Sequence, residues 1–362
     1  MNKHRACIIG LGRIASLFED DEKRIHPCTH AGALVALEDV ELVSGAARSE
    51  ESALRFKNRW NLDRVYTDYV EMIENEKPDI IGLATNPESH MEIVERIAGM
   101  GIKGILCEKP IALSLEDADR MIAACKKNDV VLMVMHNRRF NSLYREAKRI
   151  IENGEIGIVN SVVGICQGCK PNKSWQSDFE GPLLHDATHL FDILRYLFGD
   201  VDYVQSAVEK DKPSSKVEDS AYSILHFRNG IYAMTMVNER TDYMRFELEI
   251  QGSKGKIVIA TNEARLYKVF DSPYSSGFKE LKEVEYPKSE GKAINPYMEA
   301  YSELIDAIDN GNATSSTAYD GREALDIIMA IYESEMKNQE KIELPLPSIE
   351  SSLKRFNESY KK

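Results

Sequence analysis

Short apolar runs alternate with helical patterns through the first third of the chain. The runs are "ACIIG" (6–10), "ELVSGAA" (41–47), "DIIGLAT" (79–85), "GILC" (104–107) and "VVLMVMHN" (130–137). Between them, helical patterns cover 30–39, 49–60, 88–101 and 114–129. Ser49 and Ser114 stand at expected N-caps, each followed by acidic residues. Because β-branched runs alternate with helices, the pattern predicts βαβ units and a parallel sheet.

The pattern changes after about residue 157, where strand-like segments follow one another through short turns. "RNG" and "GSKG" have the residues that hairpin turns require. This predicts a largely antiparallel sheet, with helices at 140–153, 182–198, 296–310 and 320–337. The predicted domains are 1–135 and 136–345, and we expect residues 346–362 to form a polar, mobile tail.

Length and charge limit the classes of function. A chain of 362 residues exceeds the usual size of a single core, so we expect two domains. The net charge of −13 argues against nucleic acid or an anionic membrane as a partner. No apolar run reaches the roughly 18 residues of a membrane span. The first strand begins so close to Met1 that we expect no signal peptide.

Six cysteines are scattered along the chain, as is typical of reduced thiols in a cytoplasmic protein. Cys166 and Cys169 have CxxC spacing, but there is no companion pair or set of histidines at ligand spacing. On a strand their side chains would also face opposite sides. We therefore predict a cytoplasmic protein without a metal site.

The first strand runs directly into "GLGRIA", where Gly10, Gly12 and Ala15 form a GxGxxA pattern that we expect to open a helix. The first glycine permits a tight turn, and the second lets a pyrophosphate approach the backbone N–H groups of the helix start. The sequence therefore predicts an α/β fold with an N-terminal Rossmann dinucleotide-binding domain. The second domain is predicted to be α+β, with an open, mostly antiparallel sheet.

The second strand ends without the carboxylate that usually binds the ribose 2′-hydroxyl of NAD. Ala47, Arg48 and Ser49 stand there instead. A guanidinium and a hydroxyl suit a 2′-phosphate, so these residues mildly favour NADP over NAD. If Arg48 is a solvated residue of the first helical turn, NAD remains open.

Two further segments contain candidate chemistry. The fourth strand runs into Glu108, Lys109 and Pro110, and the proline fixes the direction of the preceding ammonium. In 180–199, His185, Asp186, His189 and Asp192 share one amphipathic helix with a buried stripe. His185 lies in the first turn, where the helix dipole favours the neutral imidazole that a general base requires. The residue types alone are as typical of structural histidines as of a functional site.

Together these segments resemble the glucose–fructose oxidoreductase and inositol dehydrogenase (Gfo/Idh/MocA) family over most of the chain. The resemblance rests on "GLGRIA", "ATNPESH" (84–90), "CEKPIALS" (107–114), "GEIGIV" (154–159), "HLFDILRYLFG" (189–199) and "AYDGREALDIIMAIYES" (318–334). It implies that Lys109 reaches the reacting sugar hydroxyl near the nicotinamide, that Pro110 follows a cis bond, and that His90 lies near cofactor and substrate.

The resemblance also implies an Asp four residues before the helix histidine as its partner in acid–base catalysis. Here His185 occupies that position and the acid moves to Asp186. A Lys109–His185–His189 arrangement could still remove a hydroxyl proton, or Asp186 could orient an imidazole. Residues 16–29 look inserted relative to the family, either as a surface loop or as a border of the cofactor site.

The predicted function is an NAD(P)-dependent dehydrogenase acting on a secondary hydroxyl of a sugar, cyclitol or nucleotide sugar. The predicted catalytic residues are Lys109, His185 and His189, and the predicted substrate contacts are Asp186, Arg138 and Trp175. The predicted cofactor-binding residues are Gly10, Gly12, Arg13, Ile14, Ala47, Arg48, Ser49, Thr85, Asn86, His90, Glu108 and Lys109.

Two other functions stay open. One is a redox-neutral, NAD-dependent glycosidase, and the other is a non-catalytic sensor of NAD(P) and sugar. By the same resemblance we expect a homodimer or homotetramer, formed through the open face of the C-terminal sheet.

Overall fold

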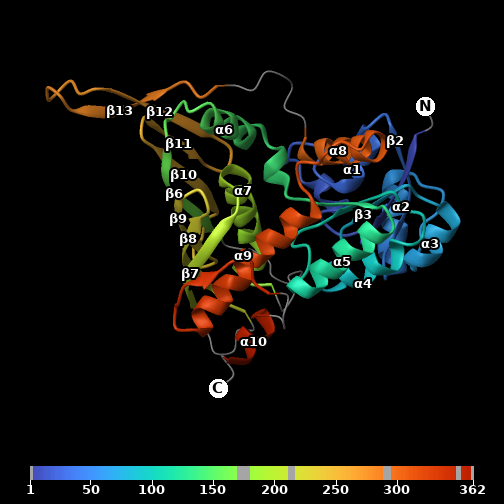
Figure 1. Ribbon diagram of the computed structural model, residues 1–362. Coiled ribbons are helices and arrows are strands. Elements are labelled where there is room, and N and C mark those ends of the chain that lie inside the picture. The colour runs from blue at the N-terminus through green and yellow to red at the C-terminus, as the bar shows by residue number, and fades with distance from the viewer. Residues whose placement is uncertain (1–2, 169–179, 211–216, 288–294, 348–351, 360–362) are drawn as a thin grey trace. The chain divides into compact units, whose positions relative to one another are not determined.

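The computed structural model describes residues 3–168, 180–210, 217–287, 295–347 and 352–359 (Figure 1). The chain divides into two compact units: Met1–Phe140 with Ile294–Arg322, and Asn141–Ala293 with Glu323–Lys362. The boundaries expected from sequence assigned 294–322 to the second domain. The structure places this segment in the first unit because helix α8 packs on that unit's sheet.

A five-stranded parallel sheet forms the centre of the first unit, in the order β2-β1-β3-β4-β5. Its strands are β1 (His4–Ile9), β2 (Val40–Ala46), β3 (Ile80–Leu83), β4 (Gly104–Cys107) and β5 (Val131–Val134). The helices are α1 (His30–Ala36), α2 (Glu50–Trp60), α3 (Tyr69–Glu76), α4 (His90–Ile97), α5 (Leu115–Lys127) and α8 (Pro296–Asn310), with short 3-10 turns η1 (Leu17–Asp20), η2 (Pro87–Ser89) and η3 (Asn137–Phe140). Both faces of the sheet are covered, which explains the continuous apolar strands.

Serine side chains cap two helices of this unit, as the sequence predicts. Ser49 and Ser114 accept hydrogen bonds from the backbone N–H groups of Ser52 and Asp117. Each cap satisfies an otherwise unpaired N–H of the first turn. Helix α3, which Asp68 caps, is an addition to the elements expected from sequence.

Helix α8 reaches the sheet at a glycine. The hydroxyl of Tyr301 lies so close to Gly82 of β3 that a Cβ there would be 2.4 Å from it. Any larger residue at Gly82 would push α8 away from the sheet. This contact joins a distant part of the sequence to the centre of the first unit.

The second unit contains a nine-stranded sheet, in the order β13-β12-β11-β10-β6-β9-β8-β7-β14. Its strands are β6 (Val159–Gln167), β7 (Val201–Glu209), β8 (Ser220–Phe227), β9 (Tyr232–Asn238), β10 (Arg245–Gly252), β11 (Gly255–Ile259), β12 (Ala264–Asp271), β13 (Lys279–Val284) and β14 (Ile342–Glu343). The β6–β9 pair is parallel and the other pairs are antiparallel. The prediction of an open, mostly antiparallel sheet is confirmed.

The helices of this unit are α6 (Ser142–Glu152), the π-helical turn η4 (Leu183–Ala187), α7 (Thr188–Phe198), α9 (Ala318–Met336), which begins in the first unit, and α10 (Ser352–Ser359). Helix α10 lies within residues 346–362, the segment that the sequence predicts to be a polar tail. Phe356 of this helix is fully buried, and its ring centroid lies 4.8 Å from that of Tyr332. Two apolar side chains spaced three residues apart, Leu353 and Phe356, are enough to bury one face of this short helix.

Candidate active site

The glycine loop after β1 has the conformation that the sequence requires. Gly10 has a φ of +89°, and its N–H donates to the Ala46 carbonyl at 2.9 Å. A Cβ on Gly10 would lie 2.7 Å from the backbone of Ala84. Glycine is therefore required here both by the positive φ and by the close approach of the loop after β3.

The sequence predicts a regular helix directly after this loop, and the structure corrects this prediction. The Ser16 N–H donates to the Gly12 carbonyl at 3.1 Å and the Phe18 N–H to the Arg13 carbonyl at 2.9 Å, after which the chain forms the short turn η1. The regular helix α1 starts later, at His30. Residues 16–29 thus interrupt the helix that would otherwise follow the loop.

The loop nevertheless fits a dinucleotide phosphate. Gly12 is exposed, and its N–H has no hydrogen-bond acceptor among the residues that the structure describes. Next to it lie Arg13, whose guanidinium carbon is 4.7 Å from the centroid of the Phe18 ring, and the half-buried Ile14. The strand order reverses between β1 and β3, and ligands of open α/β sheets bind at such a reversal, beyond the carboxyl ends of the strands.

Ala47, Arg48 and Ser49 lie directly after β2, at the same edge of the sheet. The Ser49 hydroxyl accepts a hydrogen bond from the Ser52 N–H at 3.3 Å as the cap of α2. Arg48 is exposed, and no carboxylate pairs with it in the described part of the chain. Its guanidinium is therefore available to an anion.

The loop after β3 is held by His90. This histidine is fully buried, with Nε2 at 3.1 Å from the Thr85 carbonyl and Nδ1 at 3.2 Å from the Ile111 carbonyl. Burial lowers the pKa of His90, against the opposing effect of these carbonyls. His90 thus tethers the loop of Thr85 to the segment after Lys109, and its place beside a cofactor stays a prediction. Asn86, in contrast, is exposed.

The carboxylate of Glu108 is the centre of a buried polar cluster that the sequence did not predict. Its Oε1 lies 3.1 Å from His30 Nε2 and accepts a hydrogen bond from the Tyr297 hydroxyl at 3.2 Å. Its Oε2 accepts from the backbone N–H of Lys109 at 3.2 Å. The other nitrogen of His30 lies 2.7 Å from the Tyr301 hydroxyl. We call Glu108, His30, Tyr297 and Tyr301 the Glu108 cluster.

Charge determines the protonation state at the centre of the cluster. Burial alone would raise the pKa of Glu108, but the hydrogen bond and charge of His30, with Lys109, reverse this and lower it below the ordinary value of 4.5. Burial raises the pKa of both Tyr297 and Tyr301, and so does the negative charge of Glu108. The cluster therefore contains a carboxylate and two neutral phenols at neutral pH.

Lys109 extends from the end of β4 next to this fixed carboxylate. It is half-buried, and the Lys109–Pro110 peptide bond is cis, as the resemblance implied. Glu108 thus fixes the backbone from which the ammonium projects, and its contact with a cofactor stays a prediction. The Lys109 backbone and the glycine loop lie at the same carboxyl edge, because β4 and β1 both flank β3.

Arg138 and Arg139 follow β5 on η3. Arg139 is buried, donating to the Ser315 carbonyl at 2.8 Å and pairing with Asp320 at 3.1 Å, so it fixes the structure. Arg138 is half-buried, 3.5 Å from the Asn137 side chain.

In the second unit, His185 and Asp186 lie on the π-helical turn η4, and His189 lies on α7. The sequence predicts one regular helix here. A π-helical turn inserts an extra residue, so the spacing argument for a shared face does not apply across it. His185 Nδ1 lies 3.5 Å from the Glu180 carboxylate, and Nε2 lies 3.9 Å from that of Asp186.

A second buried carboxylate holds this turn. Glu218 accepts hydrogen bonds from the Leu183 N–H at 2.9 Å and from the Tyr332 hydroxyl at 3.0 Å. Burial raises the pKa of Glu218, and the hydrogen bonds to its carboxylate only partly oppose this. Glu218 fixes the backbone two residues before His185.

The predicted site residues therefore form two groups. One is at the sheet edge of the first unit and includes Lys109, and the other is the 185–189 segment of the second unit. That the two groups meet at one substrate stays a prediction, and Trp175 lies outside the described residues. Sequence reasoning missed His30, Tyr297, Glu180 and Glu218, because no local pattern links residues so far apart in the chain.

Family models match both parts of the chain. The model described as "Oxidoreductase family, NAD-binding Rossmann fold" matches residues 4–136, and "Oxidoreductase family, C-terminal alpha/beta domain" matches residues 148–344. The chain belongs to the Gfo/Idh/MocA oxidoreductase family. The predictions of the family, of the fold class and of an NAD-binding oxidoreductase are thereby confirmed.

Individual relatives agree with this assignment. The chain is 30% identical over 260 residues to a myo-inositol 2-dehydrogenase of Thermotoga maritima, covering 70% of this chain and 74% of the relative. It is similar in structure to a levoglucosan dehydrogenase in complex with NADH and L-sorbose, with a TM-score of 0.80, 23% identity, and coverage of 95% of this chain and 100% of the other. A putative NADPH-dependent oxidoreductase from Desulfitobacterium hafniense has a TM-score of 0.80, 21% identity, and coverage of 95% and 98%.

No helix in the described part of the chain is long and apolar enough to cross a membrane. The five described cysteines are free, among them the buried Cys166, while Cys169 lies outside the described residues.

Replacing Glu108 by Gln should make the protein less stable at neutral pH by about 1–3 kcal/mol, because the buried His30 and Tyr297 lose a charged acceptor. Since the folded pKa of Glu108 is lowered, its contribution is fully present above the ordinary value of 4.5 and is lost as pH falls through the folded pKa. Denaturation curves from neutral to acidic pH should show a smaller loss of stability in E108Q.

Glu41→Gln is the matched control, because Glu41 is exposed on β2 of the same sheet. It should leave both the free energy of unfolding and its pH dependence within experimental error. Equal stability of E108Q and the natural chain at neutral pH would show that the Glu108 cluster does not stabilise the fold.

Proposed function

We propose that this chain is an NAD(P)-dependent dehydrogenase that moves a hydride between nicotinamide and a secondary hydroxyl, or ketone, of a sugar, cyclitol or nucleotide sugar. The observation that carries the proposal is the fixed position of Lys109: its backbone is held by a buried carboxylate, at the sheet edge that also contains the glycine loop. Its relatives named as myo-inositol and levoglucosan dehydrogenases support the substrate class.

The chain's own residues have separate roles in this proposal. When bound, the nicotinamide accepts or returns the hydride. Lys109 donates a hydrogen bond to the alcohol oxygen and stabilises the negative charge that develops there. His189 or His185 takes the hydroxyl proton. The negative charges of Glu180 and Asp186 beside His185 favour transfer of that proton to the His185 imidazole. Asp186 and Arg138 contact the substrate, as does Trp175.

Three loops at the sheet edge would hold the dinucleotide. Gly12, Arg13 and Ile14 would bind the phosphates, Ala47 to Ser49 would bind the adenosine ribose, and Thr85 and Asn86 would lie toward the nicotinamide. Arg48 supports a preference for NADP because its guanidinium is exposed and has no carboxylate partner in the described residues.

Lys109→Met should lower kcat by about 100-fold or more, because the transition state loses one charged hydrogen-bond donor. Initial rates on a panel of sugars, inositols and nucleotide sugars measure this, and NADH fluorescence verifies that cofactor binding is kept. Lys127→Met, on the exposed end of α5, is the control and should be fully active.

Two results would contradict the proposed chemistry. Full turnover by K109M would show that the Lys109 ammonium takes no part in the reaction. Turnover of the natural chain without a net change in NADH absorbance would instead indicate the redox-neutral reaction.

Arg48→Ala should raise the KM for NADP by about tenfold and leave the KM for NAD nearly unchanged, because a single charge-assisted contact to the 2′-phosphate is lost. Arg55→Ala is the control, since Arg55 is an exposed arginine in the middle of α2, away from Arg48 at its start. A natural chain that uses NAD better than NADP would refute the predicted preference.

We also propose a homodimer or homotetramer formed through the open sheet face of the second unit, in a cytoplasmic protein, as the free cysteines suggest. Tyr222 and Ile224 of β8 pair with Met236 and Met234 of β9, and Tyr222, Ile224 and Met234 are 41%, 42% and 55% exposed. Large apolar side chains that adjoin on one face are typical of an interface.

Replacing Ile224 and Met234 together by Lys should therefore convert the assembly to monomers, as measured by light scattering. Leu54→Lys, at a similarly exposed position on α2, should leave the assembly intact. A natural chain that is already monomeric at micromolar concentration would exclude this interface.

A further inference from the structure

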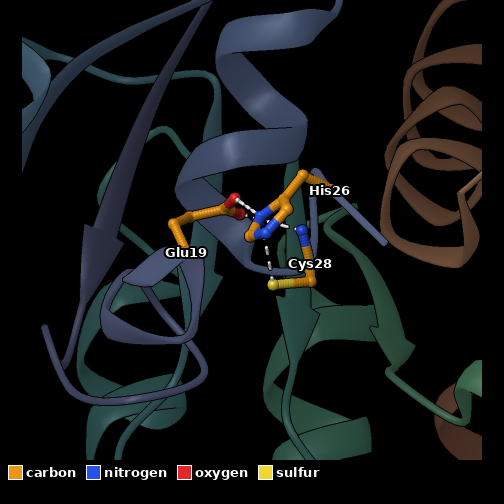
Figure 2. A group of neighbouring side chains, drawn as sticks. All are labelled: Glu19, His26 and Cys28. Carbon is orange, nitrogen blue, oxygen red and sulfur yellow. Dashed lines mark hydrogen bonds and ion pairs between the residues drawn. The ribbon is translucent and has the colours of Figure 1, made fainter. Parts of the chain in front are cut away.

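Residues 16–29 bring three potential metal ligands together. Glu19 lies on η1, and the chain then turns back so that His26 and Cys28 approach it just before α1 (Figure 2). The three side chains point toward one another, and one ligand atom from each lies within 4.8 Å of the others. None of these residues belongs to the site proposed above.

The imidazole of His26 is oriented in a way typical of a metal ligand. Its Nε2 lies 3.2 Å from the Asp21 carbonyl, which requires the hydrogen on this nitrogen. A ligating histidine commonly donates its other N–H to such an acceptor. The opposite nitrogen, Nδ1, then faces Glu19 Oε2 at 2.6 Å and Cys28 Sγ at 3.8 Å.

Three electron-rich atoms converge in this way only when a proton or a cation lies between them. With a proton on Nδ1, the group is a His26–Glu19 ion pair beside a neutral thiol whose hydrogen is directed to the Phe18 carbonyl at 3.2 Å. With a cation, all three lone pairs are satisfied by one ion.

We propose that Glu19, His26 and Cys28 bind a zinc-class divalent cation through Oε2, Nδ1 and Sγ, with water completing a tetrahedral set. Carboxylate, imidazole and thiolate ligands together suit zinc better than the hard cations. The thiol proton and the proton on His26 Nδ1 pass to solvent as the bonds from the metal to sulfur and nitrogen form. This departs from the expectation, drawn from sequence, of no metal site.

The separation of the imidazole nitrogen and the thiol sulfur is close to the one that zinc requires. Tetrahedral bonds of about 2.0 Å to nitrogen and 2.3 Å to sulfur put these ligand atoms about 3.6 Å apart, and they are 3.8 Å apart here. The Oε2–Nδ1 separation of 2.6 Å must open to about 3.3 Å. The exposed side of the His26 ring leaves room for that movement.

The second oxygen of Glu19 connects this site to the fold. Oε1 accepts hydrogen bonds from the Cys28 N–H at 2.8 Å and the Thr29 hydroxyl at 2.7 Å. Thr29 is the N-cap of α1, whose first residue, His30, belongs to the Glu108 cluster. The metal therefore fastens residues 16–29 to the start of α1 and has a structural role.

The test uses the full chain, stripped with a chelator and titrated with Co²⁺ and Zn²⁺. We expect one Co²⁺ per chain, with the sulfur-to-cobalt charge-transfer absorption that shows direct ligation by a thiolate, displacement of Co²⁺ by Zn²⁺, and a rise in Tm. Cys28→Ala should abolish the charge-transfer band. His26→Ala, at an exposed ring, should weaken binding at least about 100-fold while the chain stays folded.

Matched controls are Cys125→Ala, at another buried cysteine, and His226→Ala, at another histidine beside a carboxylate. Both should bind metal as the natural chain does. The proposal is overturned if no charge-transfer band appears in the natural chain, or if His26→Ala binds Co²⁺ with unchanged affinity. None of these measurements depends on dehydrogenase activity.

Discussion

The buried carboxylate of Glu108 is the constraint on which the first unit depends. A carboxylate in the interior is stable only when hydrogen bonds and positive charge replace the water that it has lost. Here His30 from α1, Tyr297 from α8 and the backbone N–H of Lys109 supply them. Three segments far apart in the sequence must therefore fold together before the end of β4 is fixed. The same contacts fix the position of the Lys109 backbone.

The second unit also contains a buried carboxyl group, but its pKa shifts in the opposite direction. Glu218 is buried and accepts a hydrogen bond from a backbone N–H close to His185, as Glu108 does beside Lys109. Near Glu108, the hydrogen bond from His30 and the electrostatic interactions with His30 and Lys109 lower the pKa; near Glu218, burial dominates and the pKa is raised. One buried acid is therefore an anion and the other favours its proton, while both fix a backbone that carries predicted catalytic residues.

Residues 16–29 show how an irregular segment is accommodated next to the glycine loop. It interrupts the helix that the glycine motif would otherwise open, so it must be attached to the unit by other contacts. Trp60 and Arg59 at the end of α2 donate hydrogen bonds to the side chain and the carbonyl of Ser16, each at 2.9 Å. Glu19 binds the other end through Thr29. The loop thus has fixed ends, and its candidate ligands are held in a defined geometry.

The sequence by itself determined the features that depend on neighbouring residues. Alternating apolar runs and helix caps predicted the parallel sheet, turn residues predicted the antiparallel one, and Gly10, Gly12 and Lys109 could be named from local motifs. Only the tertiary structure decided which distant residues meet: His30, Tyr297 and Tyr301 around Glu108, Glu180 and Glu218 around the 183–187 turn, and Glu19 with His26 and Cys28. It also decided that His90 is a buried tether and that α10 packs on Tyr332. The physical reason is that periodicity and turn chemistry act over a few residues, whereas buried polar contacts join segments that only the packed chain brings together.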